Sequence, residues 1–490
     1  MQEMKKSLFN SLIKFGFIVC FFSFMELISC RDKDVEALVE TIPPPNDSGE
    51  LPYLRITTAR SIKNEPKVSG NLILFENHEN VFSTQIGIEY RGSTSFRLSD
   101  KKSFGFEIWD EQKAGIDASI LGFPEEEDWI LTGHVFKASE SIIFDPSLMH
   151  HYIGYTLYRS MGRYASRTKY VELEVNEDYL GAYLLMEKLK RDKNRLDIAK
   201  LSSVDNALPE VSGGYILKID KTTGGDVATD QSLSYYEENW EDDARYSEEI
   251  SFRSKYDING NLVLGPAFDP PYHDNQYLET YFLYEYPKAD QITSQQKEYI
   301  QKYIEEFETA LLNDDFSSHD RLYTDYIDLN SFIDFFIINE ITSNVDGYRL
   351  STYLHKDRNQ KLKMGPIWDL NIGYNRQERV PTTDWIVNYN KYVERDAWMV
   401  PFWWPRLLQD PIFQQQLKTR WQLLRSSKLS NSSVLNLVQN TADYLIENGT
   451  IDRNYKRWSG IDVDYPSVID DLKIHLEQRL DWMDLQINAF

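Results

Sequence analysis

The chain has 490 residues, 41% of them hydrophobic and 27% charged, and carries a net charge of −24. An acidic surface repels phosphodiester backbones, so this composition argues against a DNA or RNA partner. The only cysteines are Cys20 and Cys30, so no disulfide or cysteine-based metal site is expected beyond them. A buried core must therefore stabilise the fold, and the chain is long enough to form one.

The first 52 residues read as a leader and a tether. Lys5 and Lys6 precede an apolar stretch at 15–24, and Leu27-Ile28-Ser29-Cys30 resembles the lipobox of bacterial lipoproteins. We predict a lipoprotein signal peptide at 1–30 with Cys30 as the lipidated residue. Residues 31–52 are polar and proline-rich, which is typical of a flexible tether. The protein is expected to be exported and to contact the membrane only through its N-terminal lipid, at the outer membrane or cell surface.

Residues 53–290 carry mostly strand patterns. Short β segments are predicted near 51–56, 71–75, 85–90 and 101–108, a hairpin at 170–175 and 181–186, and a strand at 213–219. A helix is predicted after Asp145-Pro146, with Asp145 as its cap and Pro146 in its first turn. The acidic, glycine-containing stretch at 222–248 is predicted to be an exposed loop or insertion.

From about residue 292 the pattern becomes helical. Helices are predicted from Ser294, from a cap at Asp328 or Asn330, and over 405–426, 431–447 and 466–487. Strands first and helices later indicate an α+β protein of two lobes. The β-rich lobe is placed at about 53–290, and the mainly helical lobe, which includes a hairpin near 350–368, at about 291–490.

Two aspartates flank that hairpin. Asp346 precedes the first strand and Asp369 follows the second, so the hairpin is expected to bring both carboxylates close together. Protein kinases use the same order of parts: a catalytic aspartate, a hairpin, and an aspartate that holds magnesium on the nucleotide phosphates. The alternative is that Asp346-Gly347 is an ordinary turn and Asp369 the cap of a strand end.

Several motifs in this order resemble those of the CotH kinase family, named for spore coat protein H. They include Tyr90-Arg91-Gly92-Ser93-Thr94-Ser95, Asn344-Val345-Asp346-Gly347-Tyr348 and Gly365-Pro366-Ile367-Trp368-Asp369, together with the segments 101–104, 170–173, 179–185, 187–195 and 213–217. The resemblance extends over about 51–490. It implies a two-lobed, atypical protein-kinase-like fold and a secreted enzyme that transfers phosphate from ATP to serine or threonine of exported or surface proteins. The protein substrate itself is not identified.

The resemblance also implies roles for individual residues. Asp346 matches the family's catalytic aspartate, and Asp369 matches its metal-binding aspartate, which would hold Mg²⁺ or Mn²⁺. The family often continues this motif as Asp-Phe-Asp, whereas this chain has Asp369-Leu370-Asn371. An asparagine oxygen can ligate a metal without contributing charge, so Asn371 is a weaker candidate ligand.

The sequence indicates the nucleotide-binding residues less clearly than the two aspartates, because neither a Walker loop nor Gly-x-Gly-x-x-Gly is present. We predict that the loop at 91–95, through Arg91 and Ser93, faces the phosphates and that Lys102 pairs with them. Glu187 and Lys188 are further candidates. The basic cluster at 188–195 would meet ATP or an acidic substrate, or would be a solvated face.

A second hypothesis is a non-catalytic, kinase-like surface lipoprotein that acts in binding, adhesion or glycan handling. Trp398, Trp403 and Trp404 would then form a contact surface, unless they pack the C-terminal helices. A zinc hydrolase is disfavoured, because His-Glu-x-x-His is absent and the adjacent His150 and His151 would diverge on a helix.

Overall fold

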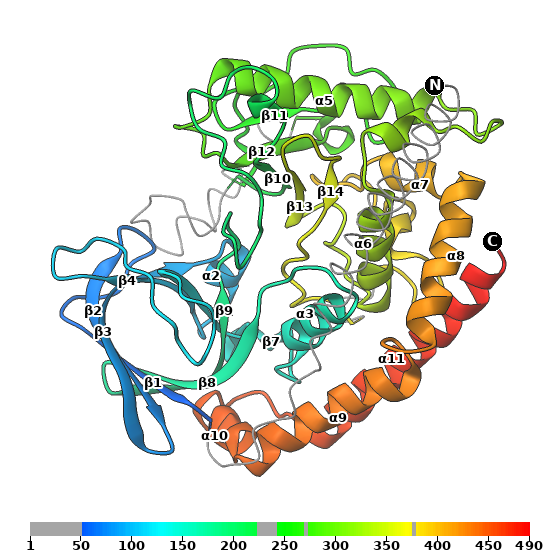
Figure 1. The fold of residues 1–490 in the computed structure, drawn as a ribbon. Coiled ribbons are helices and arrows are strands. Elements are labelled where there is room, and N and C mark those ends of the chain that lie inside the picture. Colours follow the sequence, from blue (N-terminus) through cyan, green and yellow to red (C-terminus); the bar gives the residue numbers. More distant parts are fainter. Residues whose placement is uncertain (1–50, 223–242, 269–272, 375–378) are drawn as a thin grey trace, which may run out of the picture. The chain divides into compact units, whose positions relative to one another are not determined.

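The computed structural model describes residues 51–222, 243–268, 273–374 and 379–490. Figure 1 shows how the described elements are arranged. The predicted signal peptide, Cys30 and nearly all of the predicted tether lie outside these residues, as does most of the acidic stretch predicted as an insertion.

The N-terminal strands close into a seven-stranded barrel. Strand β1 pairs antiparallel with β2 and parallel with β8, which completes the ring. Alternate residues point inward: Leu54 and Ile56 of β1 are fully buried, whereas Arg55 between them is exposed. In ring order the strands are β1 (Tyr53–Thr58), β2 (Val68–Glu76), β3 (Glu79–Arg91), β4 (Ser103–Trp109), β5 (Asp128–Thr132), β9 (Asp178–Glu187) and β8 (Thr168–Val175).

A second, five-stranded sheet contains the predicted hairpin. Its order is β11 (Ser251–Arg253), β12 (Tyr281–Tyr286), β10 (Tyr215–Ile219), β13 (Thr352–Lys356) and β14 (Lys363–Met364). Strand β10 pairs with β12 on one side and with β13 on the other. The division that the sequence suggested at about residue 290 therefore runs through one sheet, because hydrogen bonding joins strands that lie on both sides of it in the chain.

The C-terminal part is mainly helical. Helix α6 begins after Asp328, whose side chain accepts the N–H of Ser331, as predicted for a cap. Between Ser331 and Ile341 every residue of α6 is buried. The helices are α2 (Thr94–Leu98), α3 (His150–Ser160), α5 (Ser294–Asn313), α6 (Leu329–Ile341), α7 (Trp403–Leu407), α8 (Pro411–Arg425), α9 (Asn431–Glu447), α10 (Thr450–Arg457) and α11 (Tyr465–Asn488). The short hairpin β6 (Phe136–Lys137) and β7 (Ile142–Ile143) lies before α3.

Helix α3 begins four residues later than a helix with Pro146 in its first turn would. Leu148 adopts a left-handed φ of 63°, which interrupts a helix started at Pro146. The Asp145 carboxylate accepts the backbone N–H groups of Ser147 and His150. Asp145 therefore still serves the start of the helix, but across an intervening turn.

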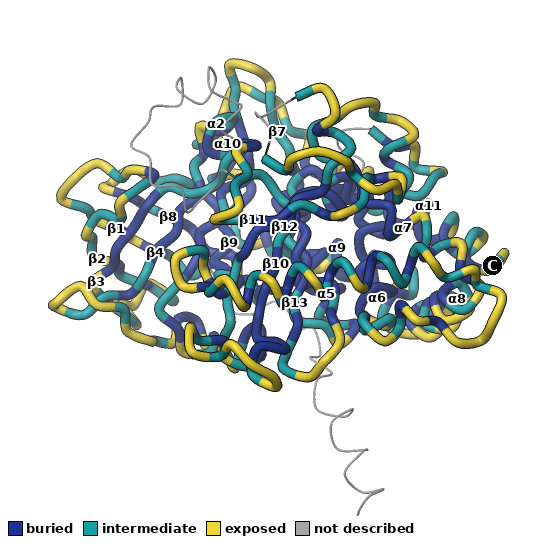
Figure 2. The backbone as a smooth tube through the Cα atoms, turned by 90° about the horizontal axis from the view of Figure 1, so that it is seen from above, coloured by how far each residue is buried: buried dark blue, intermediate teal, exposed yellow. Residues whose placement is uncertain are grey.

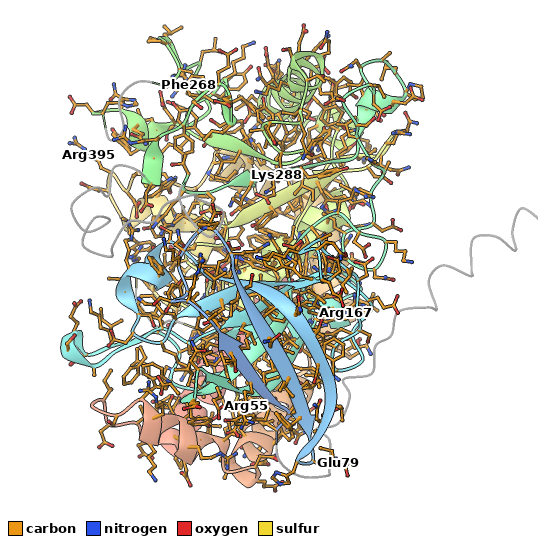
Figure 3. All side chains as sticks on the ribbon, turned by 90° about the vertical axis from the view of Figure 1, so that its left-hand side faces the viewer. Arg55, Glu79, Arg167, Phe268, Lys288 and Arg395 are labelled. Atoms are coloured by element: carbon orange, nitrogen blue, oxygen red, sulfur yellow. The ribbon has the colours of Figure 1, made fainter. Side chains whose placement is uncertain are left out.

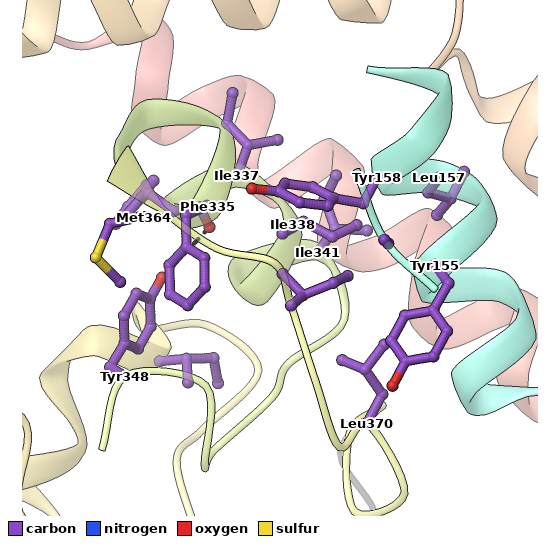
Figure 4. Close-up of a cluster of buried hydrophobic side chains, with 14 of the residues drawn as sticks. Tyr155, Leu157, Tyr158, Phe335, Ile337, Ile338, Ile341, Tyr348, Met364 and Leu370 are labelled. Atoms are coloured by element: carbon purple, nitrogen blue, oxygen red, sulfur yellow. Dashed lines mark hydrogen bonds between the residues drawn. The ribbon is translucent and has the colours of Figure 1, made fainter. Parts of the chain in front are cut away.

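The apolar residues form one core inside the barrel and a larger one around α6. In Figure 2 the strands of the five-stranded sheet and α6 are largely drawn as buried. Figure 4 shows part of the larger core, in which Ile338 and Ile341 of α6 lie near Tyr158 of α3 and Phe335 lies beside Tyr348. The structure confirms a mixed α+β protein with a β-rich N-terminal half and helices in its C-terminal part. No helix in the described part is both long and apolar enough to cross a membrane.

Helix α10, which precedes the last helix α11, packs against barrel strand β9. The Asn454 side-chain oxygen accepts from the Lys101 ammonium at 2.8 Å and from the Ala182 N–H at 3.2 Å. The indole N–H of Trp458, just after α10, donates to the carbonyl of Leu180. These bonds connect the end of the chain to the barrel through buried groups.

Candidate active site

A cavity of about 570 Å³ is lined by residues of the barrel, the five-stranded sheet and the segments that follow the hairpin. Seven of its described lining side chains are cationic and five are carboxylates, in a protein whose net charge is −24. The cations are Arg91, Lys188, Lys218, Lys221, Lys288, Arg349 and Arg379; the carboxylates are Asp220, Glu285, Asp346, Asp369 and Asp396. The cavity thus concentrates positive charge that the chain as a whole lacks.

The hairpin places both predicted aspartates in this cavity. Strands β13 and β14 pair at Leu354–Met364 and His355–Lys363, which turns the chain back toward its starting level. Asp346 and Asp369 both line the cavity, and the charge of Asp369 contributes to raising the pKa of Asp346. The proximity predicted from the sequence is therefore present.

Asp346 lies in the turn after α6, and its side chain is 18% exposed. Burial raises the pKa of its carboxyl group, whereas the neighbouring Arg349 guanidinium acts in the opposite direction. The Arg349 Nη2 donates to Asp346 Oδ1 at 2.5 Å. Gly347 is needed beside Asp346, because a Cβ there would lie 2.0 Å from Asn339 Oδ1. The turn thus presents a partly buried carboxylate whose orientation is set by one arginine.

Arg349 is a site residue that the sequence reasoning missed. Its side chain is 2% exposed, and it donates to the carbonyls of Val345 and Trp398. Its Nη1 lies 3.2 Å from Asp396 Oδ2, and the guanidinium lies 4.2 Å from the ring centre of Tyr389. Its position three residues after Asp346 was the only signal in the sequence.

Asp369 is the more accessible carboxylate, with 40% of its side chain exposed. It adopts a left-handed φ of 53°, a conformation that aspartate tolerates better than most residues. The following Leu370 is fully buried against α3, where a Cβ on Gly154 would lie 2.2 Å from Leu370 Cδ1. Figure 4 shows Leu370 beside Tyr155 of α3. The helix therefore fixes the backbone that carries Asp369.

The first two residues of α3 both reach the Asp369–Asn371 segment. The Nδ1 of His150 lies 3.0 Å from the carbonyl oxygen of Asn371, and His151 Nε2 lies 3.7 Å from Asp369 Oδ1. The two side chains diverge, as expected on a helix, yet both contact this segment because it passes the start of α3. The sequence carried no signal for these contacts.

Three of the predicted nucleotide-binding residues, Arg91, Ser93 and Lys188, line the cavity. The Arg91 guanidinium lies 5.8 Å from the ring centre of Trp368, next to Asp369. The Ser93 hydroxyl donates to Asp243, which also binds Arg97 of α2. These contacts place the loop after β3 against the cavity.

The other two residues predicted to bind nucleotide, Lys102 and Glu187, are not among the described residues that line this cavity. The Lys102 Nζ donates to the Phe96 carbonyl at 2.6 Å, and burial lowers its pKa to about 8. The Glu187 carboxylate is buried and accepts from the backbone and guanidinium of Arg167. Both side chains thus bind local groups, Lys102 just before β4 and Glu187 at the end of β9.

Further cations come from the sheet and were not predicted. Lys218 of β10 lies 3.5 Å from Asp220 and 3.9 Å from Glu285, and Lys221 lies 3.7 Å from Asp243. Lys288, which follows β12, pairs with Glu285 at 2.8 Å. Figure 3 shows Lys288 on the part of the molecule with the five-stranded sheet, and Arg55 and Glu79 on the barrel.

The basic segment after β9 is largely neutralised. The Lys190 ammonium contacts Glu126, Glu127 and Asp128 at 2.8–3.2 Å, so a cation already occupies this acidic group. Only Lys188 of the segment's lysines and arginines lies among the described lining residues. Trp403 and Trp404 are buried, Trp403 against Phe307 and Trp404 against Phe335, whereas Trp398 lines the cavity. The packing interpretation therefore holds for two of the three tryptophans.

A divalent cation would find oxygen donors at one edge of the cavity. The Asp369 carboxylate is exposed there, and Asn371 lines the same wall. Carboxylate and amide oxygens are suitable ligands for hard divalent ions. The donor set thus fits a metal ion beside a cationic cavity, although Asn371 adds no negative charge.

A mixed α+β fold with two carboxylates in a cationic cavity is suited to phosphoryl transfer. The model of the CotH kinase protein family matches residues 88–483 of the chain. The chain therefore belongs to the CotH kinase family. No curated protein matched the chain in a sequence comparison. Membership implies a kinase-like protein and, in general, the use of ATP, a divalent metal ion and a protein substrate.

Proposed function

We propose that the chain is an atypical secreted protein kinase that transfers the γ-phosphoryl group of ATP to serine or threonine of exported or surface proteins. The observation that carries the proposal is that Asp346 and Asp369 share one cavity with seven cationic side chains. The cavity is lined both by residues of the barrel and by residues that flank the hairpin. This arrangement supports a two-lobed, kinase-like fold with the cavity between the lobes.

In this proposal Asp346 is the catalytic residue for the attacking hydroxyl. The hydroxyl oxygen forms a bond to the γ-phosphorus while the bond from that phosphorus to the bridging oxygen breaks, and ADP leaves with the electron pair. Asp346 accepts the hydroxyl proton. Burial raises the pKa of its carboxyl group, which makes it a better proton acceptor than an exposed aspartate. Arg349 orients this carboxylate toward the cavity.

The cationic side chains would bind the phosphates. Arg91 and Lys188 approach from the barrel, and Lys218 and Lys221 approach from the sheet. Asp369, with Asn371 beside it, would hold a divalent cation of the Mg²⁺ or Mn²⁺ type. When bound, such an ion supplies charge neutralisation to the phosphate oxygens. Trp368, Trp398 and Tyr353 line the same cavity and offer flat surfaces to a base or a peptide.

The proposal includes an exported location. The leader at 1–30, with its lipobox-like Leu27-Ile28-Ser29-Cys30, supports a lipid anchor on Cys30 at the outer membrane or cell surface. A substrate would then be another exported or surface protein.

The second candidate function is binding without catalysis on the same scaffold. The observation that favours it is Asn371, which replaces a charged residue of the metal motif with a neutral one. Such a protein would use the cavity or its rim to hold a partner, in adhesion or in glycan handling.

Phosphotransfer from γ-labelled ATP distinguishes the two functions. We expect the parent chain, with Mg²⁺ or Mn²⁺, to transfer label to itself or to proteins of a surface extract. Asp346→Asn and Asp369→Asn should each lower transfer by 100-fold or more, since one removes the proton acceptor and the other the metal charge; this is about 3 kcal/mol of transition-state stabilisation. Asp443→Asn, an exposed carboxylate on α9, is the matched control and should retain transfer.

Two results would contradict the proposal in different ways. A parent chain that transfers no label and shows no metal-dependent nucleotide binding by calorimetry would contradict a kinase and leave the binding function as the better account. Transfer that persists in both site variants would contradict the roles given to Asp346 and Asp369.

A further inference from the structure

The segment Asp369–Asn371, which carries the proposed metal ligands, has the His151 imidazole beside the Asp369 carboxylate. His151, the second residue of α3, is 6% exposed, and its Nε2 lies 3.7 Å from Asp369 Oδ1. This separation is longer than a hydrogen bond, so the ring does not simply donate to the carboxylate. The ring edge packs against Tyr155, with ring centres 5.7 Å apart. His151 is therefore held against the exposed face of Asp369 by packing.

The separation between these two atoms suits joint coordination of one ion. Metal–oxygen and metal–nitrogen bonds of about 2.0–2.2 Å place neighbouring ligand atoms about 3.0–3.5 Å apart. A shift of a few tenths of an ångström would bring Nε2 and Oδ1 onto the same ion. Asn371 lies on the same wall and could add an oxygen.

The imidazole of His151 also lines a second, smaller chamber. A cavity of about 90 Å³ is lined by His151, His134, Asp145, Asp369 and Asn371, among others. Within the described residues, His151 Nδ1 and His134 Nε2 are buried without a hydrogen-bond partner. A cavity of this size can hold water that bonds such nitrogens. When one nitrogen of a histidine binds a metal, its other N–H needs an acceptor, and the chamber offers one through water.

The charges around the chamber also permit a cation. Asp145 is fully buried; its oxygens lie 3.4 Å from His134 Nδ1 and 3.5 Å from His150 Nε2. Arg91 lines both the chamber and the larger cavity. Asp369 is thus the only exposed carboxylate among the described residues that line this chamber. The ion would sit between it and His151.

We propose that the metal centre has a mixed donor set, with His151 Nε2 and Asp369 Oδ1 as ligands of one ion. An imidazole ligand favours first-row transition ions such as Mn²⁺ over Mg²⁺, which prefers oxygen donors. The inference rests on the proposed role of Asp369 and goes beyond it, because it names a nitrogen ligand and an ion preference. The neutral imidazole compensates in affinity, though not in charge, for the neutral Asn371.

Pulsed EPR of bound Mn²⁺ tests the nitrogen ligand directly. We would load the full chain in detergent with Mn²⁺, with and without a non-hydrolysable ATP analogue. A ¹⁴N coupling is expected in the parent, and it should change to that of ¹⁵N in protein labelled on histidine. His151→Gln should abolish the coupling. His134→Gln, a neighbouring buried imidazole of the same chamber, should retain it.

Metal titration supplies a second readout. His151→Gln should weaken Mn²⁺ binding by about tenfold or more, in the range seen when residues around a metal are changed, and should alter Mg²⁺ binding much less. The parent itself needs no substitution for the coupling measurement, so a misfolded variant would not prevent a decision.

The outcomes separate this inference from the kinase proposal. Bound Mn²⁺ without nitrogen coupling in the parent would overturn the mixed donor set and leave the kinase proposal untouched. No Mn²⁺ binding with or without nucleotide would overturn both the donor set and the metal role of Asp369. Nitrogen coupling in a chain that transfers no phosphate would support the metal centre and contradict the kinase.

Discussion

At the scale of single residues, the two aspartates occupy different environments. Asp346 is partly buried beside a buried arginine, and Asp369 is exposed at the cavity edge in a left-handed conformation. In the proposed kinase, these different environments suit the two carboxylates to different tasks, a proton acceptor and a metal ligand. The sequence was enough to single out the two aspartates. Their separate proposed roles rest on how deeply each is buried and on neighbours such as Arg349.

The pH dependence of transfer should depend on Arg349. Burial raises the pKa of Asp346 and Arg349 lowers it, so Arg349→Met should raise that pKa further. Asp346 must be ionised to accept a proton, and the acid limb of the rate profile should therefore move to higher pH. Arg379→Met removes a weaker contribution and should move the limb less. Profiles of kcat/KM for the three proteins check this order, and an unmoved limb in Arg349→Met would count against Asp346 as the base.

At the scale of elements, the site depends on how the start of α3 and the hairpin are packed against one another. Gly154 lets α3 approach Leu370 closely, and the buried α6 supports the turn that carries Asp346. Helix α5 is held in place by a buried acid, Glu308, whose side chain is 1% exposed. The Glu308 carboxyl group accepts hydrogen bonds from the Ser254 hydroxyl and from the Trp403 indole N–H. This contact joins α5 to the segments around β11 and α7.

The acid on α5 should make the stability of the fold depend on pH. Burial raises the pKa of Glu308 from 4.5 to about 8, so between these values the folded chain holds a proton that the unfolded chain has lost. Stability should therefore fall as pH rises from about 4.5 to about 8. Glu308→Gln lacks this loss and should be more stable than the parent at pH 8, by an amount on the order of a few kcal/mol.

Thermal or denaturant unfolding at several pH values measures this difference. The gain should shrink as pH falls and vanish below about pH 4.5, where Glu308 is protonated in both the folded and the unfolded parent. Glu306→Gln, on the same helix but exposed, is the matched control and should show no such trend. A gain independent of pH would mean that Glu308 is not protonated in the folded chain.

At the scale of the whole molecule, segments far apart in the sequence meet to build the fold. The buried Lys101 of the barrel is bonded to Asn454 of α10, and the buried Glu340 of α6 is bonded to Arg479 of α11 at 2.6 Å. The cavity itself is lined by residues from Arg91 to Trp398. Loss of the C-terminal helices would therefore remove partners from buried charges in the barrel and in α6.

The attachment of the whole molecule to a membrane is expected to depend on Cys30. In cells given a labelled fatty acid, the parent should take up label and sediment with membranes, because each buried CH₂ of an acyl chain contributes about 0.8 kcal/mol. Cys30→Ser should lose both the label and the sedimentation. Cys20→Ser, which changes the other cysteine of the leader, should retain them. Label that persists in Cys30→Ser would rule out the proposed lipid site.

The sequence by itself determined the element types, the hairpin and the pair Asp346 and Asp369, because strand alternation, caps such as Asp328 and turn residues act over short distances. It also carried enough ordered motifs to indicate the family. Only the tertiary structure decided that strands on both sides of residue 290 share a sheet, that Lys102 binds the Phe96 carbonyl, and that Arg349 and His151 lie beside the two aspartates. These contacts depend on how distant elements pack, and no local pattern in one sequence records that packing.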